Sequence, residues 1–547
     1  MATLALDQAP TAHAPQGPRF AHKAHPLARI LFTVILIGAL AFAGWSVLVD
    51  TRGVGEELAL GAFAFLGVAL VIALGFEFVN GFHDTANAVA TVIYTNSMPA
   101  HVAVVWSGFF NFVGVMLSSG AVAYSIITLL PVDLILHVGS AAGFAMIFAL
   151  LLAAVLWNLA TWYVGLPNSS SHTLIGSVLG VGLANQLILA GSRGGTAGVD
   201  WAQVQKVLTG LWMAPLIGFG AGLLLIVVMR LVARNPQLYR TPEGDAPPPL
   251  PIRLLMILTC TGVSYAHGSN DGQKGMGLIM LILIGCAPTA YALNRTLPVS
   301  ETPAFVQTAT QATNVFQAHG DGKPLTIDTA RGVLTASLQQ RKAEGPQVYD
   351  ALAVLSQNLS QRVASYGSLS KVPAEATSNV RNDMYLGLDT VRLITKKPAP
   401  DLSAADVAAI KAYGDKLEAG TRFIPLWVKI VVAIALGLGT MIGWKRIVIT
   451  VGEKIGKHGM NYGQGAAAGL VTAGTILAAD QFGLPVSTTH ILSSSVAGGS
   501  VGSGNGLQPK TIGHLALAWL LTLPVAMALS GGLYWLLLTI VKASGTA

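Results

Sequence analysis

Several runs of about 20 apolar residues restrict the fold of this chain more than any other feature. Residues 30–49, for example, read ILFTVILIGALAFAGWSVLV, and similar runs occupy 141–163, 211–232, 427–443 and 515–541. Only 10% of the 547 residues are charged and 53% are hydrophobic, whereas soluble domains carry about 25% charged residues. The sequence therefore predicts an all-α polytopic protein of the cell membrane, with about 10–12 passes through a hydrocarbon core ~30 Å thick.

The net charge of +7 does not indicate a nucleic-acid partner, because Lys and Arg gather beside apolar runs, where they set membrane orientation. Cys260 and Cys286 lie in or beside apolar stretches, so they offer neither a disulfide framework nor a metal-thiolate spacing. We expect residues 1–29 to be a polar tail. We expect 30–49 to be a retained helix, because the run is not followed by an obvious small-residue cleavage site.

Two pairs of motifs repeat along the chain. GLPNSSSH at 165–172 returns 318 positions later as GLPVSTTH at 483–490. NGFHDTANAVA at 80–90 resembles HGSNDGQKGMG at 267–277, with an offset of 187. The offsets differ by 131 residues, so extra material must separate the motifs of the second half. Residues 288–424 are polar, and we expect them to form a soluble insert.

The motifs and the apolar runs divide the chain into eight segments. In chain order these are an N-terminal tail (1–29), a first transmembrane helix with an external loop (30–57), a first membrane repeat (58–232), a cytoplasmic linker (233–252), the start of a second membrane repeat (253–287), the insert (288–424), the remainder of the second repeat (425–541) and a C-terminal tail (542–547).

The placement of charge predicts that the two repeats have inverted topology. The linker and the loop 444–458 are basic, as is the N-terminal tail, so we expect all three in the cytoplasm. The loop 50–57 is acidic and is expected outside, together with the insert. The chain then enters its two acidic motifs from opposite sides, which is typical of inverted-repeat secondary transporters with broken or re-entrant helices.

A Gly-Leu-Pro break followed by hydroxyl side chains is costly in lipid unless it lines a cavity or is buried in protein. The break leaves free N–H groups at the start of the next half-helix, and these form an anion site together with the positive end of the helix dipole. Two such turns would enclose one small oxyanion. An alternative is that the hydroxyl groups bond only to their own helices. The predicted hydroxyl donors to the oxyanion are Ser169, Ser170, Ser171, Ser487, Thr488 and Thr489.

Asp84 and Asp271 lie at matching positions of the acidic motifs, in apolar surroundings where an ionisable group is functional by default. A carboxylate near Asn side chains and unwound carbonyl groups suits sodium, and one that takes up a proton is the alternative coupling device. A structural ion pair, such as Asp84 with Lys274, is the non-functional interpretation. Three histidines are either protonatable relay members or fixed donors. We favour the donor role for His172 and His490, and His83 is left open.

At these residues the sequence resembles the PiT family of inorganic phosphate transporters. The family pattern G-x-N-D-x-x-N-x is similar to GFHDTANA at 81–88 and GSNDGQKG at 268–275, and its GLPxSxTH-type segments match both octapeptides. The resemblance covers both membrane repeats without the insert. It implies that phosphate and a coupling cation bind between the halves, with phosphate on the Ser and Thr residues after each Gly-Leu-Pro. The residues that match the cation-handling motif are Asp84, Asn87, Asn270 and Asp271.

Two departures from the family pattern bear on the coupling ion. His83 stands where the family commonly has Asn, and Lys274 stands where it commonly has Asn three residues after the second Asp. An ammonium group cannot ligate sodium and repels it. We therefore hypothesise that Lys274 replaces a bound cation and that phosphate is coupled to protons, as the resemblance to bacterial low-affinity members also implies. In the sodium-coupled alternative, Lys274 only pairs with Asp271 or Asp84, and sodium uses another site.

The predicted function is import of inorganic phosphate by proton symport, with the phosphate free or as a neutral divalent metal–phosphate complex. Arsenate is expected as a mimic, the bilayer as the surroundings, and a homodimer is left open. We expect no resident metal or other cofactor. A sulfate carrier is one alternative, but sulfate is not protonated near neutral pH. An intramembrane phosphatase would need a nucleophile with a base, and the adjacent Ser171 and His172 have poor geometry for this, so we predict a transporter and not an enzyme.

Overall fold

The computed structural model describes residues 25–127, 129–130, 135–193, 201–242, 244, 246–340 and 342–543. Within these residues every regular element is a helix, and the one extended pairing is an isolated bridge between Gly456 and Leu507. The prediction of an all-α protein is therefore confirmed. Most of the predicted tail 1–29 and the last four residues of the tail 542–547 lie outside the described residues.

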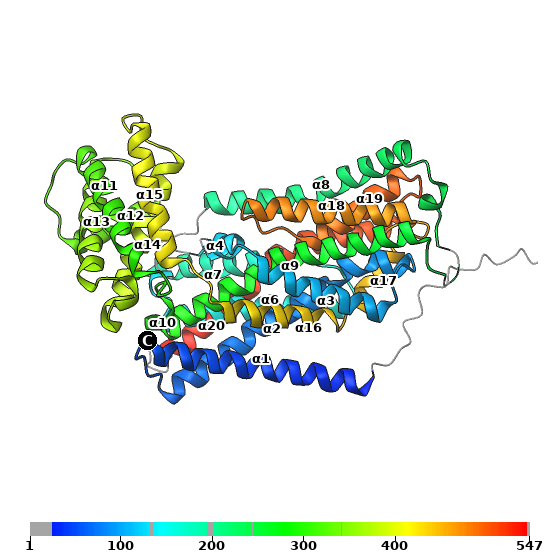
Figure 1. The fold of residues 1–547 in the computed structure, drawn as a ribbon, viewed down its shortest axis with the longest axis horizontal. Helices are drawn as coiled ribbons and strands as arrows, with labels where there is room; N and C mark the ends of the chain where they lie inside the picture. Colours follow the sequence, from blue (N-terminus) through cyan, green and yellow to red (C-terminus); the bar gives the residue numbers. More distant parts are fainter. Residues whose placement is uncertain are drawn as a thin grey trace, which may run out of the picture.

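A long bundle of helices carries a smaller helical bundle at one end (Figure 1). The long bundle consists of α1 (Pro26–Gly53), α2 (Leu60–Tyr94), α3 (Ala100–Leu117), α4 (Ala121–Ile127), α6 (Ala141–Tyr163), α7 (Ser170–Arg193), α8 (Trp201–Val232), η1 (Pro236–Tyr239), α9 (Leu250–Cys286), α16 (Leu426–Thr440), α17 (Lys445–Glu453), α18 (Tyr462–Gln481), α19 (Thr488–Gly502) and α20 (Pro509–Ala543).

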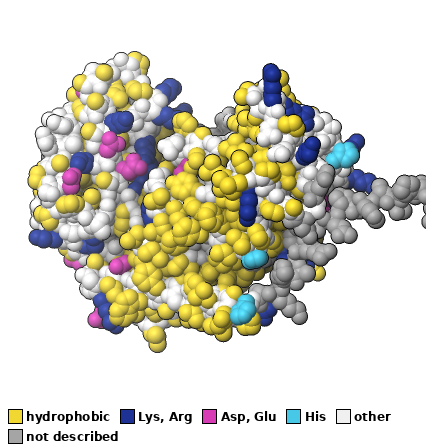
Figure 2. Space-filling view, turned by 45° about the vertical axis from the view of Figure 1, so that its right-hand side comes forward, with side chains coloured by type: hydrophobic (Ala, Val, Ile, Leu, Met, Phe, Trp, Pro, Cys, Tyr) yellow, Lys and Arg dark blue, Asp and Glu magenta, His cyan; other side chains and the backbone are white. Residues whose placement is uncertain are grey.

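The long bundle has the length and apolar surface of a membrane domain. Six helices among the described residues are long and apolar enough to cross a bilayer, namely α1, α2, α3, α6, α8 and α20. The helices Ala404–Thr421 and Leu426–Thr440, which are bent by 68° relative to each other, would add a seventh if they formed one span. The expected 10–12 passes exceed this number. Apolar side chains cover the middle of the molecule, between the polar insert and the basic far end (Figure 2). The protein is a multi-pass membrane protein, as the sequence predicts.

The second half repeats the helix packing of the first half with the partners exchanged. α8 packs against α19, and α20 packs against α7. In the same way α3 packs against α9, and α16 packs against α2. A two-fold relation between the halves produces such reciprocal pairs, with α2, α3, α6, α7 and α8 corresponding to α9, α16, α18, α19 and α20.

The corresponding helices α2 and α9 run in opposite directions. Near the start of α9, Arg253 Nε donates a hydrogen bond of 2.9 Å to the carbonyl oxygen of Ser97, which follows the end of α2. Just after the end of α9, the backbone N–H of Ala290 donates to Glu56 Oε2 at 3.1 Å, ahead of the start of α2. Antiparallel counterparts are what an inverted-topology repeat requires.

Glycines let the two halves approach closely where their motif helices cross. A Cβ atom on Gly81 of α2 would collide with the carbonyl oxygen of Leu436 in α16. A Cβ atom on Gly268 of α9 would collide with the carbonyl oxygen of Asn111 in α3. The two contacts are counterparts under the two-fold relation, and small residues permit this kind of helix packing in membranes.

The segments that we expect in the cytoplasm meet at the end of the bundle remote from the insert. There Tyr94 Oη donates to Glu453 Oε1 at 2.7 Å, and Arg230 Nη2 donates to the Ser503 carbonyl oxygen at 3.1 Å. At the opposite end Asp50 Oδ2 accepts a hydrogen bond of 2.8 Å from Tyr291 Oη, beside the insert. The basic segments and the insert thus lie at opposite ends of the bundle, and the external position of the insert stays a prediction.

The insert is a bundle with its own core. After α10 (Pro288–Tyr291) it comprises η2 (Val299–Glu301), α11 (Thr302–His319), α12 (Ile327–Gln340), α13 (Pro346–Tyr366), η3 (Leu369–Lys371), α14 (Ala374–Lys396) and α15 (Ala404–Thr421). Phe316, Leu359 and Met384 are fully buried between these helices. The buried carboxylate of Asp383 binds Arg331 through two hydrogen bonds of 2.7 and 2.8 Å, and this pairing raises the pKa of Arg331.

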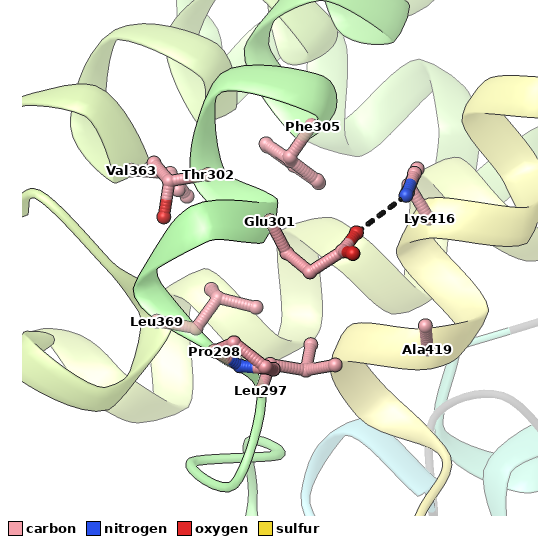
Figure 3. Close-up of a pocket in the computed structure, with 9 residues that line it drawn as sticks. All are labelled: Leu297, Pro298, Glu301, Thr302, Phe305, Val363, Leu369, Lys416 and Ala419. Atoms are coloured by element: carbon pink, nitrogen blue, oxygen red, sulfur yellow. Dashed lines mark hydrogen bonds and ion pairs between the residues drawn. The ribbon is translucent and has the colours of Figure 1, made fainter.

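A cavity of about 30 Å³ lies inside the insert where η2 meets α15. Figure 3 shows Glu301 and Lys416 facing each other across it, with Oε2 and Nζ 2.6 Å apart, above the apolar side chains of Leu297 and Leu369. This volume holds about one water molecule. The cavity therefore has no room for a ligand such as phosphate.

Candidate functional site

The acidic motifs lie on α2 and α9, which pack against each other in the centre of the bundle. Asp84 is 3% exposed and Asp271 is 1% exposed. Both helices are continuous through their motifs. The unwound carbonyl groups that would suit a sodium ion are therefore not found beside these two carboxylates. The side chains alone provide ligands at this point, since the backbone carbonyl groups are used within the helices.

The breaks in the bundle lie instead at the two Gly-Leu-Pro turns. Gly165 and Gly483 have φ angles of +73° and +61°, which glycine adopts without strain. Each turn ends in a helix cap, because Ser169 Oγ accepts a hydrogen bond of 3.1 Å from the N–H of His172, and Ser487 Oγ accepts one of 3.1 Å from the N–H of His490. Ser169 and Ser487 thus start α7 and α19, and bring the next hydroxyl groups to the carboxylates.

In the first half of the site, Asp84, Asn87 and Thr489 form a triad. Thr489 Oγ1 donates to Asp84 Oδ1 at 2.7 Å. Asn87 Nδ2 lies 2.9 Å from Thr489 Oγ1 and 3.3 Å from Asp84 Oδ1. A neutral amide thus joins the acidic motif of the first repeat to the hydroxyl turn of the second.

The counterpart triad is Asp271, Lys274 and Ser171, and here an ammonium group takes the place of the amide. Lys274 Nζ lies 2.7 Å from Asp271 Oδ2 and donates to Ser171 Oγ at 2.5 Å. Ser171 Oγ in turn donates to the carbonyl oxygen of Val486 at 2.6 Å. Lys274 is fully buried, so its positive charge is balanced inside the site and not by water. Of the two carboxylates with which Lys274 could pair, Asp271 and Asp84, the structure pairs it with Asp271.

Ser170 joins the two triads. Its Oγ atom lies 2.9 Å from Asp84 Oδ2 and 3.3 Å from Asp271 Oδ2. A hydroxyl group has one proton to donate, so it serves one carboxylate at a time. The two carboxylates are therefore close enough to act on the same bound group.

His267 is a site residue that the sequence analysis quoted within its motif but did not assign. Its Nε2 atom lies 3.7 Å from Asp84 Oδ2 and 3.6 Å from Asp271 Oδ2, while Nδ1 is held at 2.8 Å from Asn111 Oδ1. One ligand atom each of Asp84, His267 and Asp271 lie within 4.8 Å of one another, an arrangement that could hold a metal ion. The available signal was its position one helical turn before Asp271, on the same face of the helix.

The remaining predicted residues surround this centre. Asn270 stabilises the second Gly-Leu-Pro turn, because its Nδ2 donates to the Leu484 carbonyl oxygen at 3.1 Å. His83 Nδ1 lies 3.4 Å from Asp84 Oδ1. The rings of His172 and His490 face each other with centroids 4.4 Å apart. Thr488 Oγ1 is buried and has no hydrogen-bond partner among the described residues. All fourteen predicted residues thus lie in or directly beside one buried cluster.

The site combines two carboxylates, one ammonium group and several hydroxyl donors at the N-termini of the two helices α7 and α19. Hydroxyl groups and helix N-termini favour an oxyanion, whereas the carboxylates favour a proton or a metal cation. The site is therefore suited to bind an anion together with a cation or protons.

A comparison with family models agrees with this chemistry. Residues 80–530 match the model of the phosphate transporter family. The chain belongs to this family. The matched range holds both acidic motifs and both Gly-Leu-Pro turns, so the resemblance drawn from these motifs is confirmed. A member of this family is a transporter of the cell membrane and not an enzyme.

Individual relatives match over nearly their whole length. The chain is 42% identical over 504 residues to the low-affinity inorganic phosphate transporter PitA of Escherichia coli K12, covering 88% of this chain and 98% of PitA. It is 41% identical over 509 residues to PitB of the same strain, covering 89% and 100%. A solved structure described as a sodium-dependent phosphate transporter aligns with a TM-score of 0.46 and 19% identity, covering 87% of this chain and all of that one.

Proposed function

We propose that this protein imports inorganic phosphate by proton symport, through alternating access of a site between its two inverted repeats. The observation that carries the proposal is the position of Lys274. Its ammonium group occupies, between Asp271 and Ser171, the place that the amide of Asn87 occupies between Asp84 and Thr489. A fixed positive charge next to Asp271 repels a sodium ion at this point, so protons are the remaining coupling ion there.

The hydroxyl groups of the two turns support phosphate as the substrate. Ser170 and Thr489 now donate to the carboxylate of Asp84. When a phosphate group enters, these donors can turn to its oxygen atoms, and a protonated phosphate oxygen can donate to Asp84 in their place. Sulfate is not protonated near neutral pH and lacks this donor, so the site favours phosphate and its mimic arsenate.

The carboxylate–histidine cluster supports a second form of the substrate, a neutral divalent metal–phosphate complex. Asp84, His267 and Asp271 bring ligand atoms within 4.8 Å of one another, and carboxylate and imidazole groups suit divalent metals. In this form the metal is cargo. The phosphate balances the charge of the metal, so the neutral complex is not repelled by Lys274 as a bare sodium ion is, and no sodium ion is required.

The packing of the repeats supports alternating access. The site lies where elements of both halves meet, with Asp84 on one repeat bonded to Thr489 on the other. Breaking the hydrogen bonds between the triads and the opposite turns would let the halves move as bodies, as in other inverted-repeat transporters.

Phosphate uptake into proteoliposomes tests the proposal. Purified protein is reconstituted, and radiolabelled phosphate uptake is followed under an inward proton gradient without sodium, and under an inward sodium gradient without a pH difference. We expect the proton gradient to drive uptake and sodium to have no effect. Excess arsenate should inhibit, and excess sulfate should not.

A parallel series tests the metal-bound form. Uptake of a labelled divalent metal should require phosphate, and His267→Gln should reduce metal uptake more than proton-driven phosphate uptake. Sodium-driven uptake by the wild-type protein would overturn proton coupling, and uptake of neither phosphate nor metal would overturn the transport proposal.

A further inference from the structure

A charged cavity lies between the insert and the membrane bundle. Its volume is about 480 Å³. Its floor contains Gln481, Phe482 and Gly483, the start of the second Gly-Leu-Pro turn, and α14 and α15 of the insert provide the opposite wall. Figure 2 shows Lys and Arg side chains at the hollow between the two parts of the molecule. We call this cavity the vestibule.

Six charged side chains line the vestibule and carry a net charge of +2, from four cations and two carboxylates. These residues are Lys206, Asp389, Arg392, Lys396, Glu418 and Arg422.

Four of these six side chains neutralise one another. Arg392 Nη2 lies 2.9 Å from Glu418 Oε2, and Arg422 Nη1 lies 3.3 Å from Glu418 Oε1. Asp389 Oδ1 lies 3.4 Å from Arg392 Nη1 and 3.9 Å from Arg422 Nη2. The Arg422 guanidinium also lies over the ring of Tyr124 in α4, at 4.9 Å from its centroid, and so connects the insert to the bundle.

The two lysines supply the excess charge. Lys206 lies near the start of α8 in the bundle, and Lys396 ends α14 in the insert. Both are exposed, and neither forms an ion pair with a described residue. They face the same space from two separate parts of the chain, an arrangement that suits an anion bound between them.

The vestibule lies close to the buried site. Lys206 and Lys396 also line a neighbouring crevice of about 930 Å³ whose inner wall includes Leu484 and Val486. The carbonyl oxygen of Leu484 accepts from Asn270, and that of Val486 accepts from Ser171. The turn that begins at Gly483 therefore lines the vestibule and the crevice and also contacts Asn270 and Ser171 of the buried site.

We propose that the vestibule is an external capture site that attracts the phosphate anion through Lys206 and Lys396 before it reaches the buried triads. This inference rests on the proposed function. The net positive charge of the vestibule, which the two lysines supply, raises the local concentration of an anionic substrate. The insert thereby has a role in substrate affinity, since it supplies half of the lysine pair.

A phosphate oxyanion on these lysines could also belong to a phospholipid headgroup, with its acyl chain in the crevice beside Met213 and Ile217. We favour the free anion. The vestibule is walled by ionic side chains of the insert, and its floor is the turn that leads to the transport site.

The test compares Lys206→Gln, Lys396→Gln and the double variant with wild type in proteoliposomes. At an ionic strength of about 0.01 M, where the Debye length is ~30 Å, we expect the double variant to raise KM for phosphate about tenfold. Maximal uptake should not change, because the triads are intact. At about 0.15 M the difference should shrink, because exposed charges are then screened. Lys206→Arg and Lys396→Arg should retain the wild-type KM, and so should Lys342→Gln, an exposed insert residue that lines neither cavity.

The other outcomes are distinguishable. A double variant with the wild-type KM would overturn the capture site while leaving phosphate transport established by the wild-type uptake. An effect seen only in liposomes that contain phosphatidylglycerol would assign the lysines to a lipid headgroup and would also overturn it. Wild-type protein without any uptake would overturn the proposed function and this inference with it.

Discussion

Replacement of Lys274 by Asn is the sharpest perturbation of the site, because it makes the two triads chemically alike. In the wild type Lys274 Nζ lies 2.7 Å from Asp271 Oδ2, and both side chains are buried. Removal of one partner from a buried ion pair costs about 3–5 kcal/mol, since the other charge stays buried and unpaired. The variant should lose about this amount of stability unless a metal cation takes the vacated place.

The assay is the thermal stability of purified Lys274→Asn in detergent, in choline and in sodium buffers of equal ionic strength. We expect the variant to be destabilised in choline. Sodium should recover part of the loss, because a ligand at about 100 times its Kd stabilises the folded state by about 2.7 kcal/mol. Wild-type stability should not respond to sodium.

Lys429→Asn is the matched control. Lys429 Nζ donates to the Ser118 carbonyl oxygen at 2.8 Å and pairs with no described carboxylate, so this variant should show no sodium response. Equal stability of Lys274→Asn and wild type in choline would refute the reasoning that Lys274 balances Asp271. A large loss without any sodium response would refute the idea that it stands in for a cation.

Three further predictions concern packing and ion pairs. Gly81→Ala should lower the free energy of unfolding by about 1–3 kcal/mol or more, because its Cβ atom would collide with the Leu436 carbonyl oxygen. Gly75→Ala on the same helix is the control, because its Cβ atom meets no atom within 4 Å and the change should be neutral. Thermal melting compares the two variants, and equal melting temperatures would contradict the close helix crossing. Asp383→Asn should destabilise the insert by about 3–5 kcal/mol, whereas Asp328→Asn should cost about 0–1 kcal/mol. Both carboxylates bind Arg331, but Asp383 is buried and Asp328 is 85% exposed. The rate at which a protease cleaves the insert measures the difference, and similar cleavage rates for the two variants would argue against a buried pair. Asp84→Asn should abolish proton-driven uptake, because Asp84 accepts from Ser170 and Thr489 in the centre of the site; retained proton-driven uptake would exclude Asp84 from coupling.

The membrane class and the location of the site could be predicted from the sequence, because both depend on local patterns. Apolar runs identify spanning helices, and a buried carboxylate such as Asp84 is conspicuous among them. The duplicated motifs also predict that the two carboxylates come together. Inverted topology follows from loop charge alone, and the antiparallel course of α2 and α9 agrees with it.

The connections within the site could not be predicted in this way. Thr489 donates to Asp84 from a position 405 residues away, and no spacing rule fixes such a contact. Ser169 and Ser487 belong to the same hydroxyl clusters as their neighbours, yet they cap helices. The acidic motifs contain Gly and Asn residues, which lower helix propensity, yet both helices are continuous through them. Tertiary packing against glycine-rich neighbours overrides that local preference.

The role of the insert could not be predicted from a local sequence pattern either. Its helices contain no ligand motif, and its internal cavity is too small for phosphate. The vestibule forms where the insert meets the bundle, and only the folded chain brings Lys396 of the insert and Lys206 of the bundle to the same space.

Proton entry during phosphate transport tests the central claim most directly. Proteoliposomes that contain a pH-sensitive dye are placed in sodium-free buffer without an initial pH difference, and phosphate is added outside. Proton symport predicts acidification of the lumen that follows phosphate entry at the same rate, that is absent from liposomes without protein and that is unchanged by added sodium. Phosphate accumulation that requires sodium and leaves the lumenal pH constant would contradict it.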